Sequence, residues 1–297
     1  MIENRHLRYF LVLADTLHMT RAAESLHIAQ PALTQNIQQL EDELGTLLIH
    51  RKGHKLSLTE AGKVFRIEAE RSLQQFELAR ISAQRAGRGE IGTLAIGFGS
   101  TAGIDVVPQL VRSLHERYPD IRVELEEMGT AAQLAALRSG EIDVAISYGL
   151  LGDEFQSKQL TAEPLFVALP RNHRLALRDS VPIKELVNEK LILPSRQTSA
   201  TYYDTILREC AGAGFQPASI QEVTTIQTSL GLVAIGFGVS IIPASACRIL
   251  REGTVVLPLQ NSRSDARLLL IWKRDDVSPV VQKLIDLVPP KTKKHME

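Results

Sequence analysis

The stretch LHIAQPALTQNIQQLEDELG, residues 26–45, has the pattern of one amphipathic helix with an unusual polar face. Aliphatic side chains recur along it at intervals of three and four residues, at Leu33, Ile37, Leu40 and Leu44. This spacing places them on one side of a helix, where they would face a core. Pro31 suits the first turn, because its missing N–H has no partner inside the helix, and Gly45 suits the residue that ends it.

The other side of this helix carries amide and hydroxyl groups in place of Lys and Glu, at Gln30, Thr34, Gln35 and Gln38. Gln and Asn side chains can bond adenine bidentately at N6 and N7, and the major groove of DNA admits one α-helix. The pattern therefore favours a helix that reads base edges. A polar helix that faces solvent is the alternative for this stretch taken alone.

Shorter segments before this helix complete a DNA-binding motif. Apolar residues at helical spacing predict a first helix over residues 5–17, and Thr20 is expected to cap a short second helix. Two short helices followed by an amide-faced third form a helix-turn-helix, in which the last helix enters the groove.

Residues 47–58 predict two short strands joined at Lys52-Gly53. Basic side chains cluster at the tip, at His50, Arg51, Lys52, His54 and Lys55. Such a wing would meet DNA phosphates, whose contacts supply affinity and register. The alternatives are a solvated turn and a metal pair at His50 and His54, which has no carboxylate or Cys partner nearby.

A long helix is expected from Thr59, its cap, to Ala86, since this segment has no Pro and only one early Gly. Its apolar residues repeat at three and four, at Phe65, Ala69, Leu73, Phe76, Ala79, Ala83 and Ala86. A single helix cannot bury this stripe alone, so we expect a dimer through a second copy. Gly87-Arg88-Gly89 is the expected hinge.

After residue 90, predicted strands and helices alternate. Strands are expected over residues 91–98, 121–126, 142–147, 163–169, 190–193, 220–223, 239–242, 254–259 and 266–272, and helices over 104–118, 131–139 and 278–288. The first elements make a βαβαβ unit with short apolar strands, which is typical of a parallel sheet. The last strand and helix are expected to return to it, giving two α/β lobes with a ligand cleft between them.

The composition is that of an ordinary globular protein with more than one domain: 297 residues, 44% hydrophobic, and a formal net charge of zero. The apolar runs are too short for a membrane span and the N-terminus lacks a secretory leader, so the cytoplasm is the expected location. Two cysteines, Cys210 and Cys247, are too few for a disulfide framework.

The segments RHLRYF, TRAAESLHIAQPALTQNIQQLEDELG and LSLTEAG resemble the N-terminal signature of LysR-type transcriptional regulators. The resemblance implies an all-α winged helix-turn-helix plus a long linker helix, then an α/β two-lobed effector domain resembling a type 2 periplasmic-binding-protein fold. The implied boundaries are 1–59 for DNA binding, 60–89 for the linker and hinge, and 90–297 for effector binding. Lobe I would span about 90–162 and 266–297, and lobe II about 163–265.

The same resemblance implies a homotetramer on promoter DNA, contact with RNA polymerase, and no catalysis. The implied DNA-binding residues are Thr20, Arg21, Gln30, Pro31, Ala32, Thr34, Gln35, Gln38, Arg51, Lys52, His54 and Lys55. Ala29 stands where many relatives carry a Ser cap, and an Arg common near Gln35 is missing, which would shift base preference away from guanine. The segments IGFGSTAG, EMGTAAQLAALRSGEIDVAI and SLGLVAIGFGVSIIPAS resemble the branch that responds to aromatic-degradation intermediates.

Hydroxyl groups mark the expected ligand pocket. Ser100 and Thr101 follow the first strand, and Thr130 begins a helix, so hydroxyls and unpaired helix N–H groups would meet at one sheet edge, an arrangement that favours an anion. Simple helix capping by these three residues is the alternative. By resemblance, further effector-binding residues come from the second lobe, at Arg196, Thr198, Ser199, Thr201, Thr225 and Ile226.

Tyr148 stands where some dicarboxylate-binding relatives carry Arg. A phenol cannot balance a second negative charge, so the ligand is expected to be a monoanion, unless Arg196 substitutes. The predicted effector is a small organic anion, with no cofactor and no metal.

Two other functions fit the residues less well. A thiol-based redox regulator would need a low-pKa Cys, whereas Cys210 and Cys247 lie in mixed apolar helical stretches that favour buried thiols. Residues 97–103, GFGSTAG, imitate a dinucleotide-binding fingerprint, but the spacing is one residue too long for an NAD-linked oxidoreductase.

Overall fold

The computed structural model describes residues 1–297 except 53–54, 150–151, 263 and 290–297. The chain divides into two compact units, residues 1–85 and 86–297, and each is described by itself. None of the described helices is long and apolar enough to cross a membrane.

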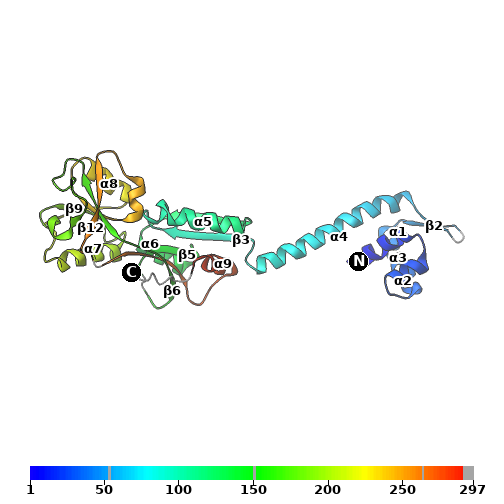
Figure 1. Cartoon of the computed structure of the whole chain (residues 1–297). Coiled ribbons are helices and arrows are strands. Elements are labelled where there is room, and N and C mark those ends of the chain that lie inside the picture. Colours follow the sequence, from blue (N-terminus) through cyan, green and yellow to red (C-terminus); the bar gives the residue numbers. More distant parts are fainter. Residues whose placement is uncertain (53–54, 150–151, 263, 290–297) are drawn as a thin grey trace. The chain divides into compact units, whose positions relative to one another are not determined.

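The first unit is a winged helix-turn-helix followed by a long helix, as predicted (Figure 1). Its elements are α1 (Asn4–Thr16), α2 (Met19–Ser25), α3 (Gln30–Leu44), β1 (Ile49–Lys52), β2 (Lys55–Leu58) and α4 (Glu60–Gly87). β1 and β2 form an antiparallel hairpin in which Ile49 lies opposite Leu58. The fold class expected for this part of the chain is therefore confirmed.

Helix α3 has the two faces that its sequence indicates. Leu33, Ile37 and Leu40 are completely buried in a core that also contains Phe10 and Leu13. Pro31 lies in the first turn, and the helix ends where Gly45 takes a left-handed conformation with φ of 66°. The amide-bearing face is left on the outside of the unit.

The start of α2 differs from the prediction. Thr20 lies inside the helix, and the cap is His18, whose imidazole Nδ1 accepts a hydrogen bond from the Arg21 N–H at 3.4 Å. Since an imidazole nitrogen can accept a hydrogen bond as a hydroxyl oxygen does, the helix begins at Met19 instead of after Thr20.

Helix α4 begins as predicted, because the Thr59 hydroxyl accepts the Gly62 N–H at 2.8 Å. The first turns of its apolar stripe pack within the same unit. The expectation that the whole stripe meets a second chain is therefore wrong for these turns. Phe65 packs edge-on against Phe10 at 5.1 Å between ring centroids, and Ala69 is 1% exposed. The stripe is exposed farther along, where Phe76 is 51% exposed.

The second unit contains two lobes, each built on a sheet. The first sheet has the order β4-β3-β5-β13-β6. Its strands are β3 (Gly92–Phe98), β4 (Ile121–Glu127), β5 (Val144–Tyr148), β6 (Phe155–Glu163) and β13 (Ala266–Lys273). β3 pairs in parallel with β4 and β5, whereas β13 runs antiparallel to β5 and β6. The return of the last strand to this lobe is confirmed, but the sheet is mixed instead of parallel.

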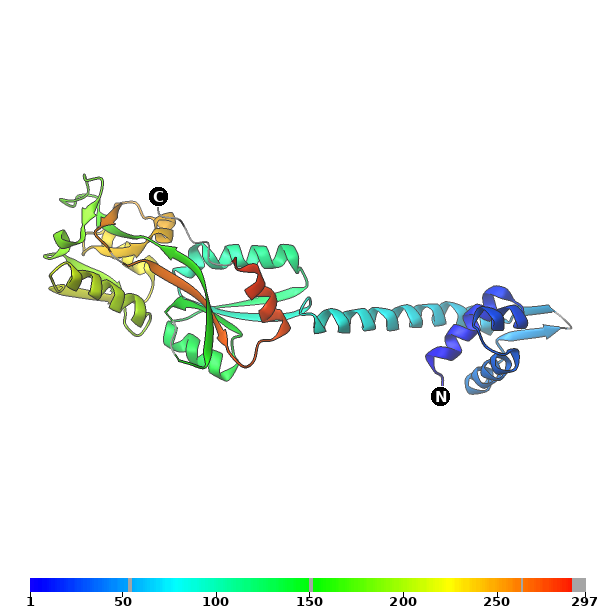
Figure 2. The same ribbon diagram turned by 60° about the horizontal axis from the view of Figure 1, so that its bottom comes forward.

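Helices cover both faces of the first sheet (Figure 2). α5 (Val106–Arg117) and α9 (Pro279–Leu287) share one core with β3, whereas α6 (Thr130–Ser139) packs on the opposite side through Leu134 and Leu137. A short 3-10 helix, η1 (Ala102–Ile104), precedes α5.

Strand β6 was missing from the predicted elements. It lies at the edge of the sheet, and most of its residues after the buried Phe155 are partly or fully exposed. Because an edge strand needs no apolar face on both sides, its sequence FQSKQLTAE has no clear alternation for a pattern to detect.

The second lobe contains β7 (Leu165–Pro170), β8 (Val181–Pro182), β9 (Lys190–Pro194), β10 (Ser219–Val223), β11 (Ser240–Pro243) and β12 (Thr254–Gln260). Its sheets have the orders β11-β7-β12-β8 and β10-β9. α7 (Ala200–Gly212) and α8 (Ile226–Ala234) pack in separate cores of this lobe, and the 3-10 helices η2 (Ile183–Leu186) and η3 (Ala244–Ile249) complete it. The chain enters it from β6 to β7 and leaves from β12 to β13.

Candidate functional site

The outward face of α3 presents side chains that are free to meet another molecule. The amides of Gln30, Gln35 and Gln38 are exposed and bond to none of the described residues. The Thr34 hydroxyl instead donates to the Gln30 carbonyl at 3.1 Å, within the same helix. The other predicted contacts of this region, Thr20, Arg21, Pro31 and Ala32, are also exposed.

The wing presents Arg51 from β1, with its side chain 40% exposed. Lys52 and Lys55 lie opposite each other at the end of the hairpin. His54, which was predicted to contact DNA, lies outside the described residues.

A buried carboxylate joins α3 to this wing. Glu41 is 5% exposed, and its Oε1 accepts hydrogen bonds from the Leu48 N–H at 2.8 Å and the Ile49 N–H at 3.0 Å. The guanidinium of Arg51 lies 3.9 Å from the other oxygen, Oε2. Glu41 was not among the predicted residues, although it follows Ile37 by four positions and so falls on the buried face.

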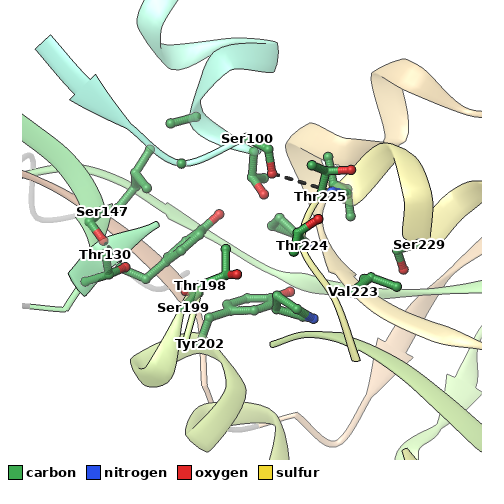
Figure 3. Close-up of a pocket in the computed structure, with 18 of the residues that line it drawn as sticks. Ser100, Thr130, Ser147, Thr198, Ser199, Tyr202, Val223, Thr224, Thr225 and Ser229 are labelled. Atoms are coloured by element: carbon green, nitrogen blue, oxygen red, sulfur yellow. Dashed lines mark hydrogen bonds between the residues drawn. The ribbon is translucent and has the colours of Figure 1, made fainter. Parts of the chain in front are cut away.

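A small cavity lies between the two lobes of the second unit (Figure 3). Its volume is about 50 Å³. Of the predicted effector-binding residues, the cavity is lined by Ser100, Thr101, Thr130, Tyr148, Thr198, Ser199, Thr225 and Ile226. It is also lined by polar residues that were not predicted, which are Ser147, Tyr202, Thr224, Ser229 and Ser240.

Each lobe supplies its lining from strand ends and helix beginnings. Ser100 and Thr101 follow β3, and Thr130 is the first residue of α6. From the other lobe, Ser199 precedes α7 and Thr225 precedes α8. The first N–H groups of a helix have no partner within it and carry partial positive charge, so the beginnings of α6, α7 and α8 bring donors to the cavity.

The hydroxyls of the first lobe do more than cap their own helices. Thr130 Oγ1 and Ser147 Oγ lie 2.7 Å apart in the buried wall. Ser100 Oγ accepts a hydrogen bond from the Ile226 N–H of the other lobe, at 3.4 Å. Simple capping, the alternative for Ser100, Thr101 and Thr130, is not seen at Thr101, whose side chain makes no cap bond, or at Thr130, which follows the cap residue Gly129. Thr225, which was not part of that alternative, does cap its helix, since its hydroxyl accepts the Thr228 N–H at 3.2 Å.

One hydroxyl in the wall lacks a partner. Ser199 Oγ is buried and makes no hydrogen bond to any described residue. A buried polar atom without a partner costs about 1–3 kcal/mol, so it marks a position where a ligand oxygen would be stabilised. Figure 3 shows Ser199 next to Thr198, on the side of the cavity formed by the second lobe.

Two tyrosines with their rings tilted against each other line the cavity. The rings of Tyr148 and Tyr202 lie 4.9 Å apart at 34°. Burial, and to a smaller extent the negative charge of Glu163, raise the pKa of Tyr148, and burial likewise raises the pKa of Tyr202. Both phenols are therefore neutral hydrogen-bonding groups at physiological pH.

The lining described above contains no charged side chain. The suggestion that Arg196 supplies a positive charge to the cavity is not supported, because its guanidinium is exposed and pairs with Asp204 at 3.2 Å. Arg196 is also not among the residues that line the cavity. The site can bind an anion through hydroxyls and N–H groups.

Thr201 lines a second cavity instead of the first. This cavity, of about 790 Å³, also touches Tyr148 and Tyr202, so the tyrosine pair separates the two spaces. Two exposed arginines, Arg208 and Arg267, lie on its wall.

Both cysteines are free thiols, and the pKa of each is raised. Cys210 is completely buried, and burial raises its pKa to about 11. Burial also raises the pKa of Cys247, in η3. Since the thiolate is the reactive form, neither residue has the environment of a redox-sensing cysteine.

Comparisons with known proteins agree with this arrangement. Residues 4–63 match the family "Bacterial regulatory helix-turn-helix protein, lysR family", and residues 87–292 match "LysR substrate binding domain". The regulator CatR of Pseudomonas putida is 39% identical over 97% of this chain and 98% of its own, and the regulator AlsR of Bacillus subtilis (strain 168) is 32% identical over 96% and 95%.

Among solved structures, full-length CbnR in complex with its target DNA superposes with a TM-score of 0.85, at 25% identity over 97% of this chain and 98% of that one. The family matches, the winged helix-turn-helix and the two-lobed second unit agree on one family. The chain belongs to the LysR family of DNA-binding transcriptional regulators, which are not enzymes.

Proposed function

We propose that this regulator binds promoter DNA as a homotetramer and responds to a small monoanionic organic acid, of the aromatic-derived class, bound between the lobes of its second unit. The observation that carries the proposal is the lining of the small cavity. It combines three helix beginnings, several hydroxyls and the unpartnered Ser199 Oγ with two aromatic rings, and it contains no charged side chain.

The lining matches one carboxylate better than two. Hydroxyls and helix N–H groups stabilise a single negative charge, and the apolar body of an aromatic acid would lie against the tyrosine rings. A second carboxylate would lose its hydration without gaining a cation, which costs several kcal/mol. The resemblance of residues 96–103 and 127–146 to the aromatic-degradation branch supports the same class of ligand.

On the DNA side, Gln30, Gln35 and Gln38 would contact base edges, and Arg51 would contact phosphates. The exposed part of the α4 stripe would join two chains, and two reading helices would then enter successive major grooves. The anion would alter the spacing of the reading helices by its different affinity for two arrangements of the lobes. We also propose that the DNA-bound regulator contacts RNA polymerase.

Calorimetric titration of the full-length protein with benzoate and with muconate tests the ligand class. We expect benzoate to bind at least tenfold more tightly than muconate. A Ser199→Ala variant should bind benzoate more weakly, because the hydroxyl is lost from the wall. Ser219→Ala, which removes an exposed hydroxyl from β10, is the matched control and should bind as the parent does.

Equal affinity for the two acids would contradict the monoanion proposal. An absence of binding for both acids, and for a panel of other aromatic monocarboxylates, would contradict the proposed function.

A further inference from the structure

The loop that precedes α7 already contacts the donors that an effector would use. The Thr198 carbonyl accepts a hydrogen bond from the Thr130 N–H at 2.8 Å. Thr130 begins α6, so this N–H is one of the few in the helix that has no partner within it. A carbonyl oxygen of the second lobe thus lies where a carboxylate oxygen would bind.

A second helix beginning also donates its first N–H to a group of the other lobe. Ile226 is the first residue of α8, and its N–H donates to Ser100 Oγ of the first lobe at 3.4 Å. In both places, one lobe satisfies a helix donor of the other lobe. These bonds join the lobes and also occupy the anion-binding positions of the cavity.

Two glycines of the first lobe allow this approach. A Cβ at Gly129 would lie 3.1 Å from the Thr198 Cα and 3.2 Å from the Thr198 carbonyl oxygen. A Cβ at Gly149 would lie 2.4 Å from Thr201 Oγ1. The loop therefore rests on bare backbone at both positions, and a larger residue would push it away.

An exposed ion pair closes the lobes at another point. The guanidinium of Arg248, in η3, lies 2.5 Å from the carboxylate of Asp105, which precedes α5. Neither residue lines the cavity. This ion pair therefore favours the closed arrangement without contributing to the cavity wall.

The cavity of this closed arrangement is small for an organic acid. It is about 50 Å³, whereas pockets that hold small organic ligands usually have roughly 300–1,000 Å³. We therefore expect an acid to enter as the lobes or the loop of residues 195–201 move apart. Breaking the bond between Thr198 and Thr130 frees the first N–H of α6 for such an acid.

We propose that this closed arrangement is a self-latched state, in which the Thr198 carbonyl occupies the first N–H of α6 and the effector carboxylate displaces it. The inference rests on the proposed function, because it concerns the same cavity. A carboxylate makes a charge-assisted hydrogen bond that is roughly twice as strong as that of a neutral carbonyl, which drives the exchange. Effector binding then separates the two lobes at this point, because a single N–H makes one well-aligned hydrogen bond at a time.

The Gly129→Ala variant tests the latch. Gly129 has φ of −69° and ψ of 159°, which an alanine adopts without strain, so the added methyl acts only by pushing Thr198 away. Gly212→Ala is the matched control, because a Cβ at this position, at the end of α7, meets nothing within 4 Å. Arg248→Gln is a second test, because it loosens the lobes and leaves the cavity lining unchanged.

Amide hydrogen exchange of the full-length protein, without any ligand, reports on the latch itself. We expect Gly129→Ala to accelerate exchange at the first residues of α6, with no change in Gly212→Ala. Unchanged exchange in Gly129→Ala would show that the Thr198 carbonyl does not protect this N–H, and would overturn the latch.

Calorimetric titration with benzoate reports on the competition. We expect Gly129→Ala and Arg248→Gln to bind benzoate about two- to tenfold more tightly than the parent protein, the range set by the net worth of one hydrogen bond. Equal or weaker binding in both variants would overturn the competition, because the latch would then be part of the bound state. If no acid binds any of these proteins, the proposed function fails, while the exchange measurement still decides whether the latch exists.

Discussion

Replacing Glu41 is expected to separate the wing from the reading helix. In Glu41→Ala, the N–H groups of Leu48 and Ile49 lose their acceptor, and these two residues are 1% and 2% exposed. A buried donor without a partner costs about 1–3 kcal/mol, so two donors cost roughly 2–6 kcal/mol. This is a large part of the free energy of unfolding of a small domain, which is about 5–15 kcal/mol.

The Glu41→Gln variant keeps an acceptor oxygen and loses the charge. Neutral hydrogen bonds contribute about 1 kcal/mol less than charged ones, so we expect a loss of roughly 1–2 kcal/mol. Differential scanning calorimetry of the full-length protein would measure both variants in the unfolding of the first unit. Asp42→Ala is the matched control, because it removes an exposed carboxylate from the next position of the same helix.

The functional consequence follows from the position of Arg51, which lies on the first strand of the wing. Below the unfolding temperature, Glu41→Ala should bind promoter DNA more weakly and with a flatter dependence on salt, since the slope falls by about 0.9 for each phosphate that the wing no longer neutralises. If Glu41→Ala is no less stable than Asp42→Ala and keeps the salt slope of the parent, the carboxylate does not position the wing and the reasoning is refuted.

Two further predictions concern the reading helix α3 and the thiols. In mobility-shift titrations, Gln35→Ala should lower the affinity for the specific promoter by about 1–3 kcal/mol and leave non-specific DNA binding unchanged. Gln39→Ala, which changes another exposed amide of α3, should have little effect, and equal losses on both kinds of DNA would contradict base reading. Because burial keeps the Cys210 thiol protonated until its pKa of about 11, it should react slowly with a thiol reagent at pH 7.5 and faster as the pH rises toward 11, and peroxide should leave promoter affinity unchanged; a peroxide-dependent change in affinity would favour the redox alternative.

Local patterns predicted the elements with strong periodicity. The three- and four-residue spacing of Leu33, Ile37 and Leu40 predicted both the helix and its buried face, and the apolar runs of the first lobe predicted its central strands. The hydroxyls at Ser100 and Thr130 were predicted for the cavity because strand ends and helix beginnings meet at one sheet edge.

Features that depend on proximity between distant segments were missed. Edge strand β6 owes its structure to pairing with β13 and not to its own pattern. Ser229 and Ser240 look like ordinary core residues of the second lobe, but they line the cavity because that lobe closes against the first. Arg196 looked like a cation for the ligand, and only the position of Asp204 shows that its charge is already paired.

The amino-acid order by itself determined the amphipathic helix α3 with its amide-bearing face, the order of the domains and several hydroxyls of the cavity, because each of these follows from the spacing of side chains along one element. The tertiary structure decided which groups are already occupied: Glu41 holds the wing, and the Thr198 carbonyl holds the first N–H of α6. The physical reason is that a hydrogen bond is made only within about 3 Å, and no periodicity in a chain specifies which distant residue will come that close.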